Sequence, residues 1–277
     1  MQLYVSPHLD DAVLSCGGMI ARTRRGAGRA VVLTVFASGP RGGKLTPYAA
    51  RYHAKCGIAD LWTRRWEDIE ACELLGAELI HLQFPEILYR RDHHGRPRCR
   101  SRHELFSQLR PDDTAVVAEV TSALAHWIRR LSPATVYGPV GLGEHVDHVA
   151  TNAALRQAIS DLGADAPRLL LYEEMPYAAL NQASTANTAA ALRHLKSTAT
   201  PNTHRLTEED WAHKIRAIEA YRSQLPSIWH GTDWRAELRA YAQQLVPGGL
   251  GEQTWTPTLD RSSSAGPADA DVRSSGT

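Results

Sequence analysis

Residues 30–37, AVVLTVFA, form a continuous apolar run that only one threonine interrupts. A strand with one face in solvent alternates apolar and polar residues, whereas a continuous run fits a strand that is covered on both faces. Strands of that kind are typical of parallel sheets with helices packed above and below. This run therefore favours an α/β fold with residues 30–37 in the middle of a parallel sheet.

The chain before and after this run alternates short apolar segments with stretches of helical periodicity, and Gly76 is a typical helix stop. Alternation of this kind predicts α/β architecture with right-handed crossovers. The predicted strands are residues 3–5, 30–37, 79–84, 135–137 and 169–172, and the predicted helices are residues 11–25, 64–76, 114–131 and 148–162.

We expect one domain over residues 1–255 that ends in a helical extension, with helices at 207–224 and 234–245. A disordered tail, residues 256–277, should follow, because most of it is Ser, Gly, Ala and Asp with little apolar bulk. Two further stretches, 39–62 and 87–111, are rich in Arg, Gly, His and Pro. They are predicted to be long loops, either functional lids and binding loops or variable surface insertions.

Composition excludes several classes of protein. The 277 residues carry a formal net charge of +1, so no overall basic field attracts nucleic acid. No segment approaches the roughly 20 apolar residues of a membrane span, and the first residues do not resemble a signal peptide. The four cysteines show no C-x-x-C spacing. We expect a cytoplasmic protein with reduced thiols and no nucleic-acid or membrane partner, and the oligomeric state stays open, a homo-oligomer included.

The first cluster of reactive side chains lies in SPHLDDAVLSCGG, residues 6–18, directly after the first predicted strand. Ligands of open α/β sheets bind at the carboxyl ends of strands, where His8, Asp10 and Asp11 would lie. A helix N-cap would explain one aspartate but not a second with a histidine. Imidazole and carboxylate together suit zinc, and adjacent aspartates point in different directions. One can therefore bind a metal while the other faces a metal-bound water.

The second cluster is GEHVDH, residues 143–148, which follows the predicted strand at 135–137. His145 and His148 are three residues apart, so near a helix start they can face a common side. A further histidine would complete a catalytic zinc site with three protein ligands and an open fourth position. A structural zinc in a binding module is the competing hypothesis, and it would close all four positions with protein.

The two motifs in this order resemble the PIG-L/LmbE-like zinc-dependent N-deacetylases. Weaker similarity covers Arg64-x-x-Glu67-x-x-x-Ala71-x-x-x-Leu75-Gly76 and Lys214-x-x-Ala217-x-x-x-Tyr221-x-Ser223-Gln224. The resemblance implies a Rossmann-like, mostly parallel sheet with helices on both faces. It also implies N-deacetylation of an amino sugar or related glycoside, with Zn²⁺ as the cofactor or another divalent ion such as Fe²⁺ in its place.

The resemblance also implies roles for six residues. His8, Asp11 and His148 would hold zinc, and Asp10 would be the general base on zinc-bound water. His145 would stabilise the oxyanion or protonate the leaving amine, and Asp147 would orient His145. The sequence departs from the common family pattern at Ala12, where many members have Glu, and at Glu144, where a small residue is frequent.

Substrate contacts are predicted at Arg64, Glu86 and Glu144. The alternative for Arg64 is an ion pair with Glu67 on the surface of its own helix. The expected partner is a small N-acylated molecule, either an amino sugar or a glycosylated compound such as an antibiotic of secondary metabolism. Two alternatives stay open: a metal-dependent esterase or amidase with a non-sugar substrate, and a non-catalytic zinc-containing module that binds small molecules.

Overall fold

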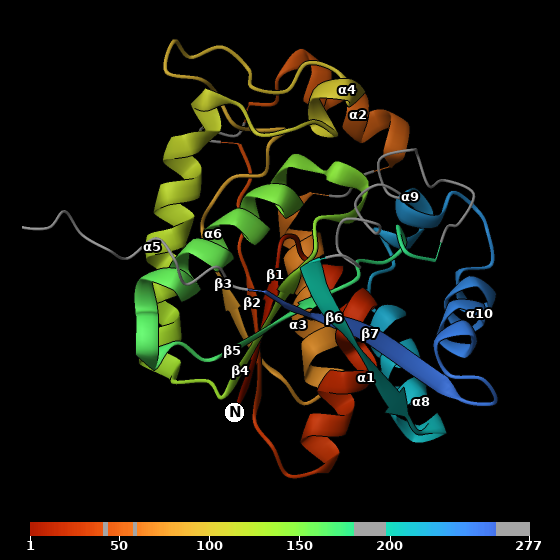
Figure 1. Ribbon diagram of the computed structural model, residues 1–277. Coiled ribbons are helices and arrows are strands. Elements are labelled where there is room, and N and C mark those ends of the chain that lie inside the picture. Colours follow the sequence, from red (N-terminus) through yellow and green to blue (C-terminus); the bar gives the residue numbers. More distant parts are fainter. Residues whose placement is uncertain (41–43, 58–59, 180–197, 259–277) are drawn as a thin grey trace, which may run out of the picture.

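The computed structural model describes residues 1–40, 44–57, 60–179 and 198–258 (Figure 1). Its centre is a seven-stranded sheet of order β3-β2-β1-β4-β5-β7-β6. The first five strands of this order are parallel, and β7 is antiparallel to both β5 and β6, so the predicted mostly parallel sheet is confirmed. The strands are β1 Gln2–Ser6, β2 Ala30–Thr34, β3 Glu78–His81, β4 Thr135–Pro139, β5 Arg168–Tyr172, β6 Ala199–Leu206 and β7 Leu250–Pro257.

Helices cover both faces of the sheet, as predicted (Figure 1). Helices α5 and α6 pack on one face, and α1, α3, α8 and α10 pack on the other. The longer helices are α1 Asp11–Arg25, α3 Leu61–Leu74, α5 Thr114–Leu131, α6 Val146–Leu162, α8 Glu208–Ile218 and α10 Trp234–Leu245.

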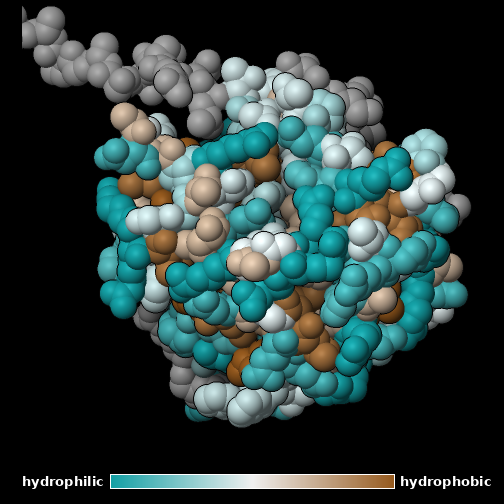
Figure 2. Space-filling model, turned by 90° about the horizontal axis from the view of Figure 1, so that it is seen from below, coloured by the Kyte–Doolittle hydropathy of each residue, from teal (hydrophilic) through white to brown (hydrophobic). Residues whose placement is uncertain are grey.

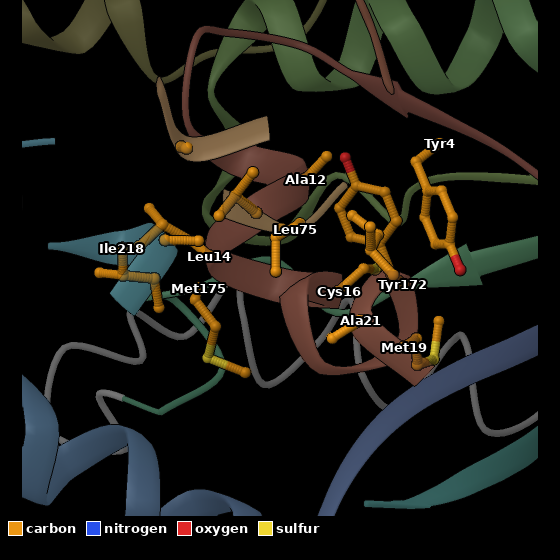
Figure 3. Packing of buried hydrophobic residues seen from close by; sticks show 14 of the residues in the cluster. Tyr4, Ala12, Leu14, Cys16, Met19, Ala21, Leu75, Tyr172, Met175 and Ile218 are labelled. Carbon is orange, nitrogen blue, oxygen red and sulfur yellow. The ribbon is translucent and has the colours of Figure 1, made fainter. Parts of the chain in front are cut away.

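Strands β1 and β2 contain continuous apolar runs because their alternate side chains are buried in opposite layers. Tyr4 packs in the layer of α1 (Figure 3). Its ring stacks on that of Tyr137, with ring centroids 4.5 Å apart. Leu3 and Val5 point into the layer of α5 and α6. In β2, Val32 lies on the α1 side while its neighbours face the other layer. Burying each such side chain stabilises the fold by roughly 1.5–3 kcal/mol.

The two segments that were predicted to be long loops contain helices. Helix α2, Pro47–Cys56, begins after the cap Thr46, whose side chain accepts the Ala49 N–H, and α4 spans Arg102–Leu105. Both helices pack against the start of α6 through a small core of their own, and they lie over the carboxyl end of the sheet (Figure 1). That core consists of Ala49, Ile87, Leu88, Cys99, Leu105 and Val146.

The prediction of a helical extension was incomplete, because the carboxyl-terminal region adds β6 and β7 to the sheet besides helices α8 and α10. Both strands are rich in polar residues and lack the apolar runs of the parallel strands. In β7 the buried polar side chains find partners: Gln253 accepts a hydrogen bond from Thr203 at 2.7 Å. The predicted tail boundary was also wrong, since Thr256 and Pro257 belong to β7, and residues 259–277 lie outside the described residues.

A buried ion pair joins this extension to the helix of the first motif. Lys214 of α8 and Glu252 of β7 are both almost fully buried, and their charged atoms are 2.7 Å apart. Glu252 also accepts the backbone N–H groups of Gly18 and Met19, at 3.0 and 2.8 Å. Gly17 lies against Lys214, where an added Cβ would come within 3.0 Å of the lysine side chain. The glycine pair of the first motif therefore permits close packing of α1 against the extension.

Replacing Lys214 with methionine is expected to lower the free energy of unfolding by about 3–5 kcal/mol, because it leaves Glu252 buried without its counter-charge. Urea denaturation followed by circular dichroism measures this change. The double variant Lys214→Met/Glu252→Gln should recover part of the loss. If Lys214→Met is as stable as the wild type, the ion pair does not hold the extension in place.

Figure 2 views the molecule from below in the orientation of Figure 1, the end at which the parallel strands begin. Hydrophilic residues cover most of this end, and hydrophobic residues lie between them in smaller groups (Figure 2). Among the described residues, no helix is both long and apolar enough to cross a bilayer. The reactive side chains of the two motifs lie at the opposite end of the sheet.

Candidate metal centre

The order of the strands brings the two motifs together. β1 lies between β2 and β4, and the chain order of the strands reverses between β1 and β4. Such a switch point opens a crevice at the carboxyl ends of the strands, because neighbouring connections leave in opposite directions. The first motif follows β1 and the second follows β4, so both enter this crevice although about 140 residues separate them.

Three atoms converge there, one from each of the residues predicted to bind metal. His8 Nδ1 lies 3.1 Å from Asp11 Oδ2, His148 Nε2 lies 3.2 Å from the same oxygen, and the two nitrogens are 3.3 Å apart. Two imidazole nitrogens and a carboxylate oxygen are typical donors of a catalytic zinc site with an open position. The atoms are close enough to share one ion, so the residues present fit a divalent metal.

Each of these histidines has a carboxylate on its other ring nitrogen. Asp147 Oδ2 lies 3.1 Å from His8 Nε2, and Glu174 Oε1 lies 3.2 Å from His148 Nδ1. Carboxylates in this position fix the tautomer and orientation of metal-binding histidines. Glu174 is itself held by the backbone N–H groups of Gly141 and Leu142. Both rings are therefore oriented with their remaining nitrogen toward Asp11.

The electrostatic field of the cluster favours positive charge. Burial opposes protonation of His148, but the Asp11 charge and the hydrogen bonds to Asp11 and Glu174 outweigh it and raise the pKa of His148 to about 9. In the same way the hydrogen bonds to Asp11 and Asp147 raise the pKa of His8 against the effect of burial. A field that stabilises imidazolium also attracts a divalent cation, which agrees with the chemistry of the donors.

Asp10 lies beside the three donors, at the N-cap position of α1, but it does not cap the helix. Within the described ranges its carboxylate makes no hydrogen bond to the protein. Burial raises the pKa of Asp10, and the neighbouring Asp11 charge adds to the effect, while Arg64 and His8 oppose it. A carboxylate with free lone pairs and a raised pKa is suited to accept a proton near neutral pH.

His145 lies against both metal-site histidines, with ring centroids 4.8 Å from His8 and 5.3 Å from His148. Its Nδ1 accepts the backbone N–H of Asp147 at 3.2 Å, which places the proton of the neutral ring on Nε2. Burial and the nearby His8 charge lower the pKa of His145 well below its usual range. A ligand atom of His145 also lies within 4.8 Å of those of the other two histidines.

Asp147 was predicted to orient His145, but the structure directs its carboxylate to other partners. That carboxylate is directed to His8, to the backbone N–H of Ile87 at 3.0 Å and to the guanidinium of Arg90 at 2.6 Å. Only the backbone of Asp147 contacts His145, through the hydrogen bond described above. Asp147 therefore supports one of the predicted metal ligands rather than the predicted acid.

The predicted substrate residues Arg64 and Glu86 lie together at the same site. Arg64 Nη1 is 2.6 Å from Glu86 Oε1, and both side chains are buried. The alternative pairing of Arg64 with Glu67 does not occur, because Glu67 accepts hydrogen bonds from the backbone and hydroxyl of Ser223. Arg64 instead donates to Gln224, which also donates to the carbonyl of Leu9 beside Asp10.

Glu144 does not join this cluster. Its backbone has a left-handed φ of 57°, and its side chain accepts a hydrogen bond from Gln108 at 3.2 Å. Two residues that do contact the site, Glu174 and Arg90, were missed. Glu174 follows β5 at the same sheet edge as the motifs, which is a signal that could have found it. Arg90 lies in a segment that was predicted to be a charged loop, and nothing local in the sequence points to it.

Fold and site together define an α/β protein with a candidate divalent-metal centre at the switch point of its sheet. The profile of the GlcNAc-PI de-N-acetylase family, PIG-L, matches residues 3–159. The chain belongs to this family, and the predicted family, fold class and reaction class, hydrolysis of an N-acyl amide, are confirmed.

Similar proteins include 2'-N-acetylparomamine deacetylase of Streptomyces fradiae, which is 32% identical over 80% of this chain and 72% of its own length. Among solved structures, the deacetylase of the antimicrobial A40926 pseudoaglycone is 29% identical, with a TM-score of 0.73 over 93% of this chain and 97% of that chain. The zinc-inhibited form of teicoplanin deacetylase is 28% identical, with a TM-score of 0.76 over 92% and 96%.

Proposed function

We propose that this chain is a metal-dependent hydrolase that removes an acyl group, most simply acetyl, from the nitrogen of an amino sugar carried on a small molecule. The observation that carries the proposal is the convergence of His8 Nδ1, Asp11 Oδ2 and His148 Nε2 within 3.3 Å, beside the free carboxylate of Asp10. These three residues would hold the ion. A bound divalent ion supplies Lewis acidity, which polarises an amide carbonyl and makes water more acidic.

Asp10 and His145 would move the protons. Asp10 accepts the proton of the attacking water, because its carboxylate makes no hydrogen bond within the described residues and its pKa is raised. His145 donates from Nε2 to the carbonyl oxygen as negative charge develops there, or to the departing nitrogen. One such donor contributes about 3 kcal/mol to transition-state stabilisation, and acid–base catalysis contributes roughly 10²–10⁴-fold.

The proposed ion is Zn²⁺, since two imidazoles and one carboxylate are the ligand types of catalytic zinc sites. Reconstitution of the metal-free protein with Zn²⁺, Fe²⁺ or Co²⁺ tests this choice. Activity that returns with Zn²⁺ at one equivalent supports it. Activity that returns with Fe²⁺ and not with stoichiometric Zn²⁺ would identify Fe²⁺ as the cofactor.

The substrate proposal takes its support from relatives, whose names describe deacetylation of 2'-N-acetylparomamine, of the A40926 pseudoaglycone and of teicoplanin. We infer an N-acylated amino sugar within such a glycosylated molecule. Arg64 and Glu86 lie close enough to the centre to affect its charges, since Arg64 lowers the pKa of Asp10 and Glu86 raises that of His8. We propose that they contact the sugar hydroxyls of a bound substrate.

The function is tested by measuring amine release from a panel of N-acylated compounds. The panel contains a free N-acetyl amino sugar, an acetylated pseudo-disaccharide, an N-acylglucosaminyl aglycone and a non-sugar amide. We expect release from at least one amino sugar, and loss of that release in chelator-treated protein. Release that survives complete removal of metal, or release confined to the non-sugar amide, would contradict the proposal.

A further inference from the structure

The segment that follows β3 buries two arginines that the sequence presents as part of a charged loop. Arg90 and Arg98 are 8% and 4% exposed. A buried guanidinium is costly unless a carboxylate compensates its charge. Arg98 forms two hydrogen bonds to Asp113, at 3.0 and 2.6 Å. Arg90 forms an ion pair with Asp147 instead, so one of the two arginines is directed to the metal centre.

The ion pair of Arg90 and Asp147 is the outer part of a chain of contacts. Arg90 Nη1 lies 2.6 Å from Asp147 Oδ1, and Asp147 Oδ2 lies 3.1 Å from His8 Nε2. Arg90 also lies over the ring of Phe36, 5.1 Å from its centroid. Among residues that the structure describes, its Nε and Nη2 have no hydrogen-bond partner, and its Nη1 also donates to the carbonyl of Pro85 at 3.3 Å. Its charge is therefore paired with the carboxylate of Asp147.

The two metal-site histidines are supported differently. Glu174, which contacts His148, is held by two backbone N–H groups, which no side-chain substitution removes. Asp147, which contacts His8, is held by the N–H of Ile87 and by the side chain of Arg90. The orientation of His8 therefore depends on a side chain in a way that the orientation of His148 does not.

We propose that Arg90 is a positioning residue of the metal centre, which holds Asp147 so that His8 presents Nδ1 to the ion. This inference rests on the proposed metal site and adds a function for the segment after β3. Residues that orient metal-binding histidines typically change metal affinity by 10–100-fold when removed. Arg90 acts one contact further out, and because it compensates a fully buried carboxylate its removal also disturbs Asp147.

The test compares Arg90→Met with Arg98→Met, a matched loss of a buried arginine from the same segment. Zn²⁺ affinity is measured by competition with a chromogenic chelator, a readout that does not depend on turnover. We expect Arg90→Met to bind Zn²⁺ about 10–100-fold more weakly than the wild type. Arg98→Met should stay within about twofold, the scatter expected for an independent site. If the methionine variants do not fold, Arg90→Lys and Arg98→Lys replace them in the same comparison.

A double variant tests whether Arg90 acts through Asp147. Asp147→Asn should also weaken Zn²⁺ binding, and adding Arg90→Met to it should change the affinity by no more than about twofold further. Wild-type affinity in Arg90→Met, an equal loss in Arg98→Met, or a full additional loss in the double variant would each overturn the inference. A wild-type protein that binds no divalent metal would instead refute the proposed function.

Discussion

Alanine at position 148 is expected to remove the metal from the protein. His148 supplies one of three converging donor atoms, and removing an outer carboxylate alone typically costs 10–100-fold in affinity. Loss of the ligand itself should weaken binding by more than about 100-fold and leave the purified variant essentially metal-free and inactive. Metal analysis by inductively coupled plasma mass spectrometry measures the occupancy.

His204→Ala is the matched control for this prediction. His204 is a partly buried histidine on the outer strand β6, where it contacts Thr254 at 2.7 Å. This variant should keep full occupancy. Full occupancy in His148→Ala as well would remove His148 from the ligand set.

Asp10→Asn is expected to lower turnover while the protein keeps its metal. Asp10 is next to Asp11 in sequence but contributes no atom to the converging donors, so Asp10→Asn should keep most of the metal. Turnover should fall by roughly 10²–10⁴-fold, because an amide cannot accept the proton of the attacking water. Metal content and the rate of amine release, measured on one preparation, report the two effects separately.

Loss of turnover in Asp10→Asn should not come from unfolding. Burial raises the pKa of Asp10 in the folded protein, so the ionised carboxylate costs stability at pH values above its unfolded pKa. Asparagine removes that cost, and the metal-free variant should melt at or above the temperature of the metal-free wild type. Wild-type turnover in Asp10→Asn would exclude Asp10 as the base.

Much of the candidate metal centre could be predicted from the sequence because its proposed ligands lie in short motifs at strand ends. His8 and Asp11 follow β1, His148 follows β4, and the rule for parallel sheets brings both ends into one crevice. The role of Asp147 could not be predicted in the same way, since its partner His8 is 139 positions away. The family resemblance implied His145 as its partner, whereas the fold directs the carboxylate across the crevice to His8.

Strand β6 of the carboxyl-terminal extension and the contacts between the two weaker motifs could not be predicted from local sequence either. Residues Ala199–Leu206 carry a proline and several polar side chains, so no apolar periodicity marks them as strand β6. The two weaker motifs are also explained only in three dimensions, where they contact each other. Glu67 binds Ser223, Asp68 binds Tyr221 and Arg64 binds Gln224. Partners of this kind depend on packing between distant segments, which local patterns do not encode.

We expect His8, Asp11 and His148 to share one divalent ion. A crystal structure of the protein with Zn²⁺ added at one equivalent, with anomalous diffraction recorded at the zinc absorption edge, tests it most directly. The expected result is a single strong anomalous peak next to His8 Nδ1, Asp11 and His148 Nε2, at about 2.0–2.2 Å from each donor atom. A peak elsewhere, or a refined structure in which His148 points away from His8 and Asp11, would contradict it.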